Sequence, residues 1–318
     1  PVELVDINVD EIIAQAPDAA DYPDADAIIL LNQFSHDVLP TGKSRYTSHQ
    51  VIKLLTERGI QKYDDLAIAY HSTGQNIAVN IARTITPNGA SVEPPDDAFN
   101  DVTPPGLLAY NLYSDTMWKV ISMPALEPGA CIEYQVTLED AGAESIGSQT
   151  WFWGGFSFQS TDPTLRSTYA LRLPKEMKFR WKATHCQLDP QILHNEETDT
   201  YIWTYGETPA IKEETGMPPI DDIAPRLSYS SVESWDAVYK WYKDLAKEQY
   251  TADEAIEETV QRLTEGLTTQ EEKIRALYHF IASQIRYVGI ELGQGAYQPT
   301  PASQVLTTRY GDCKDKST

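Results

Sequence analysis

The sequence has few basic residues, few cysteines and no long apolar run, and each shortage excludes a class of protein. Lysine and arginine total 25 against 47 aspartates and glutamates, so the formal net charge is −22. Nucleic-acid binding needs clustered Lys and Arg, so we expect no nucleic-acid partner, and anionic membrane surfaces are disfavoured for the same reason. The longest apolar runs, such as residues 27–31, have five residues. A membrane helix needs about 20, so no transmembrane segment is expected in this chain.

The three cysteines, Cys131, Cys186 and Cys313, are too few for a disulfide framework, and their separations match no zinc-binding pattern. A bridge between Cys131 and Cys186 is weighed against the commoner behaviour of a buried cysteine as a small hydrophobic residue. Residues 42–44 look like the end of a phosphate-binding loop, but aspartate replaces the required glycine at position 37. Neither a metal nor a cofactor is therefore expected.

The spacing of apolar residues changes near residue 209 and divides the chain. Before this point, short apolar runs alternate with turn signals, which is the rhythm of an all-β sandwich. The clearest strand, residues 77–85, has period-two alternation and is followed by an Asn-Gly turn at 88–89. We expect an α+β chain with an N-terminal extension over 1–21, an antiparallel β-sandwich domain over 22–208, a proline-rich linker over 209–229 and a helical region over 230–318.

Capping signals predict the helices of the last region. Each signal pairs Ser or Thr with Glu three residues later and precedes an apolar stripe of period 3.6. The pairs are Ser230 with Glu233, Thr251 with Glu254, and Thr269 with Glu272. A fourth, short helix is expected to begin at Pro301.

An aromatic segment, Trp-Phe-Trp-Gly-Gly-Phe at residues 151–156, has two interpretations. Closely spaced aromatic rings suit a sugar-binding or partner-binding surface. Alternatively, the rings pack between two sheets while the glycine pair forms a bulge. We favour packing, because aromatic residues are good strand formers.

Residues 309–316, Arg-Tyr-Gly-Asp-Cys-Lys-Asp-Lys, have the clearest chemical signal. Gly311 permits a sharp turn and Asp312 is a good N-cap, so Cys313 is expected in the first turn of a helix. Helix N-terminal amides and Lys314 favour a thiolate there, whereas Asp312 and Asp315 oppose it. A purely structural cysteine at a helix start is the alternative.

These residues belong to a wider resemblance. The C-terminal region resembles the start of a bacterial transglutaminase-like domain, and the region before it resembles the β-rich domain of unknown function that precedes such domains in bacterial members. The C-terminal stretches that carry the resemblance are 274–278, 285–287, 298–299, 302–306 and the Gly-Asp-Cys-Lys-Asp-Lys motif at 311–316. The upstream stretches are 22–31, 51–56, 82–89 and 124–134.

The resemblance implies a papain-like Cys-His-Asp triad with Cys313 as its nucleophile. The backbone N–H of Cys313 is the expected oxyanion donor, and Gln294, Gln298 and Tyr287 remain alternatives for a second donor. Every histidine precedes the cysteine, at His36, His49, His71, His185, His194 and His279. We therefore expect a parent protein that is a cysteine peptidase, amidase or transglutaminase-like enzyme, and a chain truncated after the cysteine motif that is inactive.

Several further expectations follow from the resemblance. The substrate is a protein or peptide, and the protein is exported to the periplasm or cell surface. Leu277 and Ile281 are expected to be partly exposed, which favours self-association or cover by a partner chain. The rival hypothesis is a non-catalytic protein- or glycan-binding adhesion module of the cell envelope.

Overall fold

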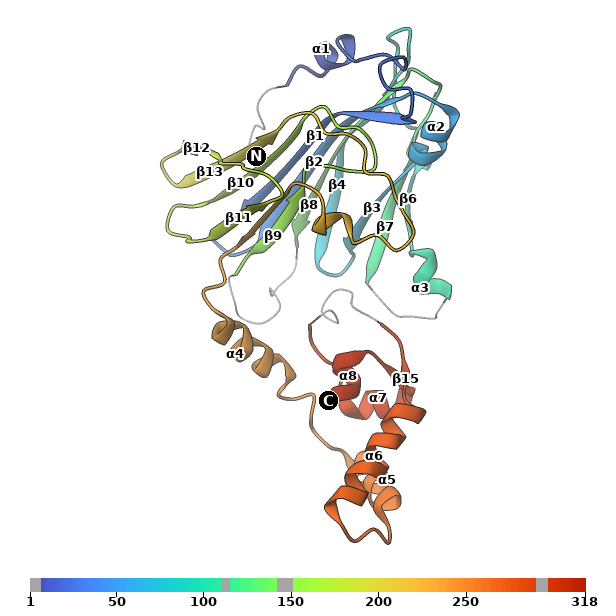
Figure 1. The fold of residues 1–318 in the computed structure, drawn as a ribbon, viewed down its shortest axis with the longest axis vertical. Coiled ribbons are helices and arrows are strands. Elements are labelled where there is room, and N and C mark those ends of the chain that lie inside the picture. Colours follow the sequence, from blue (N-terminus) through green and yellow to red (C-terminus); the bar gives the residue numbers. More distant parts are fainter. Residues whose placement is uncertain (1–6, 110–114, 142–150, 290–296) are drawn as a thin grey trace. The chain divides into compact units, whose positions relative to one another are not determined.

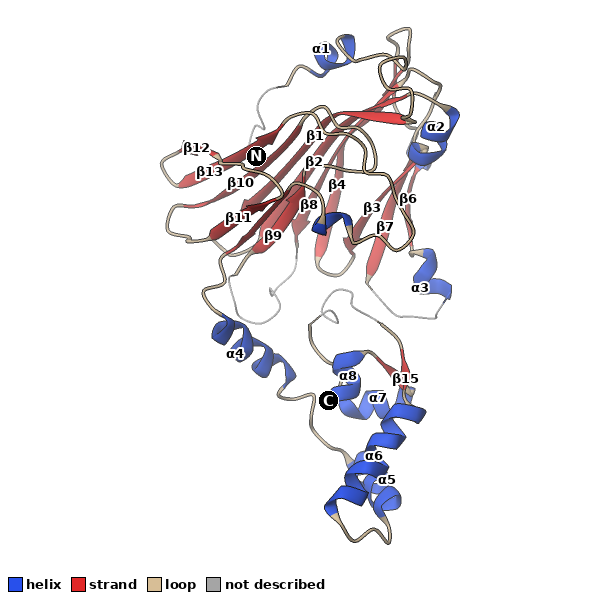
Figure 2. Ribbon diagram, viewed as in Figure 1, coloured by secondary structure: helices blue, strands red, loops and turns tan. Residues whose placement is uncertain are grey.

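Figure 1 shows the computed structural model of the chain, which describes residues 7–109, 115–141, 151–289 and 297–318. The chain divides into two compact units. The first comprises Pro1–Pro104, Thr116–Ser145 and Thr150–Val232, and the second comprises Pro105–Asp115, Ile146–Gln149 and Glu233–Thr318. Strands dominate the first unit and helices the second (Figure 2), so the predicted β-rich region followed by a helical region is confirmed.

An eight-stranded sheet forms the centre of the first unit. Its strands, in spatial order, are β12 (Gln191–His194), β13 (Thr198–Tyr205), β10 (Ser167–Pro174), β1 (Ala27–Val38), β2 (Ser44–Leu54), β8 (Cys131–Asp140), β4 (Gln75–Ile85) and β5 (Ser91–Val92). The pair β1 and β10 is parallel, with Asn32 opposite Ser167, and the other pairs are antiparallel. The sheet is therefore mixed and not purely antiparallel as expected. Period-two alternation reports which face a side chain takes, and it says nothing about strand direction.

Two three-stranded sheets cover one face of the large sheet and complete the predicted sandwich. One contains β3 (Asp65–His71), β7 (Thr116–Ser122) and β6 (Phe99–Val102), and the other contains β11 (Arg180–Thr184), β14 (Arg226–Ser230) and β9 (Trp153–Ser157). Leu66 and Ile121 of the first small sheet pack in one core with Ile52 of β2. Leu227 of the second packs with Tyr169 of β10 in another core. Burial of these apolar faces holds the layers together.

The N-terminal extension packs on the opposite face of the large sheet. Helix α1 (Val9–Ala14) begins after Asn8, whose side chain accepts a hydrogen bond from the Glu11 amide. Val9 joins a core with Ile28 and Val51, two side chains on the second face of β1 and β2. The extension therefore contributes to the fold of the first unit.

Two rings of the aromatic segment at 151–156, those of Phe152 and Phe156, pack between the sheets, as predicted for alternate rings. Phe152 is buried in the core beneath β9, whereas Trp153 is 46% exposed. The glycines have a different role from the predicted bulge, because β9 pairs with β14 in an unbroken register. A side chain at residue 154 would collide with the Tyr229 hydroxyl, so Gly154 leaves room for the Tyr229 side chain.

The segment expected as a linker takes part in the fold of the first unit. Its end forms strand β14, which lies between β11 and β9, and Ile220–Asp222 form a 3-10 turn. The proline-rich composition therefore marks an irregular but packed segment. Ser230 is the last residue of β14, which explains why it does not cap a helix.

The helices of the second unit begin at slightly different residues from those predicted. Ser234 caps α4 (Trp235–Ala246) and Asp253 caps α5 (Glu254–Thr264), so the first two predicted boxes are wrong. In each case a residue nearer the helix supplies the capping oxygen. Thr269 and Glu272 form the predicted box at the start of α6 (Gln270–Gln284).

The remaining elements are short. They are α2 (Glu57–Tyr63), 3-10 turn η1 (Asp96–Ala98), α3 (Pro105–Ala109), β15 (Arg286–Tyr287), α7 (Ala302–Thr308), β16 (Tyr310–Gly311) and α8 (Cys313–Ser317). Pro301 precedes α7 as its N-cap, one position from the prediction. In the described part of the chain, every helix is too short or too polar to cross a membrane.

Candidate active site

Cys313 is the first residue of α8, and its side chain is exposed. Asp312 caps this helix, as predicted: its carboxylate accepts hydrogen bonds from the backbone N–H groups of Lys314 at 3.1 Å and Asp315 at 3.2 Å. Asp312 itself is fully buried. The cap therefore fixes the first turn of α8, while the Cys313 side chain stays exposed to solvent.

Asp315 completes the turn and ties it to a second segment. Its carboxylate accepts a hydrogen bond from the Asp312 amide at 3.1 Å, which closes a capping box, and another from the Thr300 amide at 2.7 Å. The Asp315 side chain is buried. One carboxylate thus joins the cysteine turn to the segment that leads into α7.

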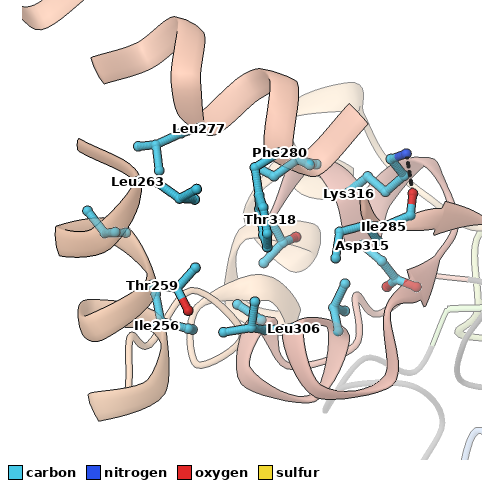
Figure 3. Close-up of a pocket in the computed structure, with 14 residues that line it drawn as sticks. Ile256, Thr259, Leu263, Leu277, Phe280, Ile285, Leu306, Asp315, Lys316 and Thr318 are labelled. Atoms are coloured by element: carbon cyan, nitrogen blue, oxygen red, sulfur yellow. Dashed lines mark hydrogen bonds between the residues drawn. The ribbon is translucent and has the colours of Figure 1, made fainter. Parts of the chain in front are cut away.

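A two-stranded parallel pair supports the turn from the other side. In this pair β15 lies beside β16, with Tyr287 opposite Gly311. The Val288 amide donates to the Gly311 carbonyl at 3.0 Å. Lys316 extends from α8 and donates through Nζ to the Ile285 carbonyl at 2.7 Å (Figure 3). These bonds link the first turn of α8 to the end of α6.

The charges around the thiol partly neutralise each other. Lys314, expected to favour the thiolate, donates through Nζ to the Asp312 carboxylate, which was expected to oppose it. The two side chains therefore form an ion pair beside Cys313. Asp312 already accepts from the amides of Lys314 and Asp315, so the helix dipole and the backbone N–H of Cys313 remain as the features that favour negative charge on sulfur.

The other two cysteines lie in different environments, and all three thiols are free. The disulfide considered between Cys131 and Cys186 is therefore absent. Cys131 is buried in the first unit, and desolvation raises the pKa of its thiol to about 11. Desolvation also raises the pKa of Cys186 above its ordinary value. Cys313 is the cysteine with both exposure and a helix start.

The structure places the residues considered as partners of the thiol. The Gln298 side chain donates to the Leu245 carbonyl at 3.2 Å. Tyr287 is 58% exposed, and Gln294 lies outside the described residues. His279, the histidine of the second unit, is exposed on α6 with its ring against Tyr278, and the other five histidines belong to the first unit.

An apolar cavity of about 160 Å³ borders α8 within the second unit (Figure 3). Side chains from α5, α6, α7 and α8 line it, among them Leu263, Leu277, Phe280, Leu306 and Lys316. Ile281 also lines it and is 37% exposed, which confirms the predicted partial exposure of this stripe. Cys313 does not line the cavity, so the cavity belongs to the packing of the unit and not to the thiol.

Helix α4, on which only an apolar stripe was expected, contributes residues to the surroundings of the thiol. The Ala302 amide donates to the Gln249 carbonyl at 3.0 Å, just beyond the end of α4. Desolvation and the neighbouring Tyr250 raise the pKa of Tyr242, and charges on Lys314, Asp312 and Cys313 also act on this phenol. Tyr242 therefore lies in the electrostatic surroundings of the thiol. The sequence offered no signal for this beyond the regular spacing of aromatics on the helix.

Comparison with protein families gives two matches. Residues 40–212, more than half of the chain, match the family described as "Domain of Unknown Function with solved-structure structure (DUF3857)". Residues 257–318 match the transglutaminase-like superfamily. Both matches agree with the resemblance found in the sequence.

Among solved structures, a similar fold is found in the crystal structure of "a putative protease from Parabacteroides distasonis ATCC 8503". The TM-score is 0.79 and the sequence identity is 19%, so the likeness shows the fold alone. The match covers 92% of this chain and 57% of that protein, so the chain spans little more than half of its length. No curated protein gives a significant match.

Proposed function

We propose that this chain, which belongs to the DUF3857 family and carries a transglutaminase-like segment, supplies the cysteine nucleophile of an acyl-transfer reaction on a protein or peptide. The observation that carries the proposal is an exposed thiol on the first residue of a helix whose start is held by two buried carboxylates, Asp312 and Asp315. A nucleophile needs this combination of access and fixed position.

The proposed reaction begins when the thiolate sulfur of Cys313 adds to a carboxamide carbon. The carbonyl π electrons move onto oxygen, and this oxyanion accepts a hydrogen bond from the backbone N–H of Cys313, which has no acceptor within the helix. The C–N bond then breaks, the amine leaves with a proton, and a thioester remains on sulfur. Water releases an acid in a peptidase or amidase, whereas a second amine gives transamidation.

Proton transfer is the part of this mechanism that the histidines of the chain do not supply. Five of them belong to the first unit, and His279 is exposed on α6. We therefore assign the base, which takes the thiol proton and later protonates the amine, to a histidine outside these six positions. This assignment predicts that the 318-residue chain by itself is inactive.

The test compares this chain with the protein as its gene encodes it. Both are incubated with casein and a fluorescent amine, with and without Cys313→Ala. We expect turnover by the encoded protein, a thioester adduct on Cys313 by mass spectrometry, and loss of both in the variant. Turnover that survives Cys313→Ala would refute the nucleophile, and turnover by the 318-residue chain would refute the assignment of the base.

Export to the periplasm or cell surface is also part of the proposal. Its support is the resemblance to bacterial transglutaminase-like proteins that carry a preceding β-rich domain. Fractionation of cells that express the encoded protein, followed by immunoblotting, tests it. Recovery in the cytoplasmic fraction alone would contradict the proposal.

A further inference from the structure

Helix α4 presents a row of aromatic side chains on one face. Trp235, Tyr239 and Tyr242 are spaced by four and three residues, so they fall within an arc of about 60° on a helix with 3.6 residues per turn. Trp235 is 86% exposed and Tyr239 is 65% exposed. Aromatic side chains at this exposure are unusual on a helix that has no contact to make, because burying each of them would remove a large apolar area from water.

The row leads to the reactive cysteine. Its last member, Tyr242, is half-buried, and the charges of Cys313 and of the capping residue Asp312 act on its phenol. Tyr239 and Trp235 follow on the same face, about one and two turns further along the helix. The aromatic row therefore extends along α4 from the surroundings of the proposed active site.

Hydrogen bonds hold this end of α4 in place beside the cysteine turn. Near the C-terminal end of the helix, the Leu245 carbonyl accepts from the Gln298 side chain at 3.2 Å. The Gln249 carbonyl, beyond the helix, accepts from the Ala302 amide at 3.0 Å. The segment between these two partners contains Thr300, whose amide donates to Asp315 of α8. A ring contact between Trp241 and Tyr297 adds to this anchor. The row is therefore fixed relative to Cys313 within the second unit.

Lysines occupy the neighbouring flank of the same helix. Lys240, Lys243 and the C-cap residue Lys247 are exposed and lie about one quarter of a turn from the aromatic row, on a flank that also carries the exposed Asp236. None of the three forms an ion pair with another residue in the described ranges. Three lysines to one carboxylate give this flank a positive charge, in a chain whose net charge is −22. It complements carboxylates on a partner and not further basic groups.

We propose that this face of α4, defined by Trp235, Tyr239, Tyr242 and the three flanking lysines, binds an extended acidic polypeptide and presents it to Cys313. Large apolar side chains of the polypeptide lie on the aromatic rings, and acidic side chains meet the lysines. Aromatic residues of this kind dominate binding energy at protein interfaces. The delivery to Cys313 rests on the proposed function, whereas the binding itself does not.

The test measures binding of fluorescein-labelled β-casein, an unfolded acidic polypeptide, by fluorescence anisotropy. The double variant Trp235→Ala/Tyr239→Ala is expected to raise the Kd by about tenfold or more. The matched control is Tyr278→Ala, which removes a tyrosine that is 67% exposed on α6, and its Kd should stay within about twofold of the parent. Lys240→Gln/Lys243→Gln should weaken binding and reduce its dependence on salt.

Two controls separate a lost surface from a damaged fold. Each variant should keep the circular dichroism spectrum of the parent and the parent rate of Cys313 alkylation by iodoacetamide. A Kd for the double variant equal to that of Tyr278→Ala would overturn the proposal, and so would the absence of any β-casein binding by the parent.

The same experiment distinguishes this proposal from the proposed function. Cys313→Ala should bind β-casein with the parent Kd, because the thiol is not part of the binding face. If the parent binds through α4 and the encoded protein forms no thioester, the acyl-transfer function fails while the binding face stands. If turnover occurs with a KM that the double variant leaves unchanged, the function stands and the binding face is wrong.

Discussion

The backbone of Gly311 approaches Asp315 so closely that a Cβ on residue 311 would lie 2.6 Å from the Asp315 Cβ. No such separation occurs between real side chains, so one of the two residues must be glycine. Because Asp315 also accepts hydrogen bonds from Asp312 and Thr300, it cannot move aside without releasing them. The glycine of the motif is therefore required by packing at the cysteine turn.

This contact predicts the effect of Gly311→Ala. The added methyl group should push Asp315 off its two donors and destabilise the second unit by about 1–3 kcal/mol. Scanning calorimetry of the chain measures the loss. Gly289→Ala is the control, because open space surrounds that position. Equal melting temperatures for the two variants would show that the turn tolerates a side chain.

The three thiols should react at different rates. Cys313 is exposed, whereas burial raises the pKa of Cys131 to about 11 and desolvation raises that of Cys186. Since the thiolate is the reactive form, iodoacetamide near neutral pH should modify Cys313 first. Mass spectrometry after brief alkylation gives the order. Faster modification of Cys186 would count against the special position of the helix start.

A buried histidine predicts a loss of stability in acid. His36 is fully buried, with Nδ1 2.7 Å from the Tyr229 hydroxyl and Nε2 2.8 Å from the Ser44 hydroxyl. Desolvation lowers its pKa to about 3 from 6.5. Between these values the unfolded chain binds a proton that the folded chain does not. The free energy of unfolding should therefore fall as the pH falls below 6.5, by up to about 1.4 kcal/mol per pH unit.

The variant His36→Gln isolates this contribution. Urea unfolding of the parent and the variant between pH 7 and pH 4 should give a shallower dependence for the variant, whatever its stability at pH 7. The other histidines and the carboxylates are common to both proteins. Their contributions to the pH dependence therefore cancel when the variant is compared with the parent. Identical slopes would mean that His36 accepts a proton in the folded state.

Two cross-strand ion pairs on β8 should differ in their contribution to stability. Glu133 is buried between Arg83 at 2.6 Å and His49 at 2.9 Å, whereas Glu139 pairs with Arg45 at the surface. Desolvation raises the pKa of Glu133, but the hydrogen bonds from His49 and Arg83 lower it further, so the pKa lies below its ordinary value. Its contribution is therefore present above the pKa of an unfolded glutamate and is lost as the pH falls.

We expect Glu133→Leu to cost about 3 kcal/mol at pH 7, because it removes the close partner of the partly buried Arg83 and leaves only the exposed Asp10 carboxylate at 3.8 Å. Glu139→Leu should cost about 1 kcal/mol or less, since exposed ion pairs contribute little. Urea unfolding of the two variants compares these values directly. Similar losses of unfolding free energy in the two variants would indicate that water reaches the ion pair of Glu133.

The sequence predicted the features that depend on local patterns. Thr269 and Glu272 cap α6 because a capping box needs only neighbouring residues. Asp312 and Cys313 take their predicted places for the same reason. The strand over residues 77–85 follows from alternation alone, and β4 contains it. Patterns within a few residues therefore locate the starts of α6 and α8 and the candidate nucleophile, whereas Ser234 and Asp253 replace the predicted caps of α4 and α5.

Features that depend on distant residues could not be predicted in this way. The parallel pairing of β1 with β10 joins Asn32 to Ser167, and nothing near either residue indicates it. Tyr242 lies in the electrostatic surroundings of Cys313 because carbonyls near the end of α4 bind Gln298 and Ala302. Tertiary contacts decide both features, and they determine which side chains surround the thiol.

The parallel pairing of β1 and β10 also constrains the order in which the chain can fold during synthesis. β1 lies in the middle of the large sheet, yet the strand that covers one of its edges begins at Ser167. Until the ribosome has released β10, the edge of an apolar strand is open, and such edges pair readily with other chains. Contacts this far apart in sequence also slow folding. The first unit should therefore complete its fold late in translation and depend on chaperones until then.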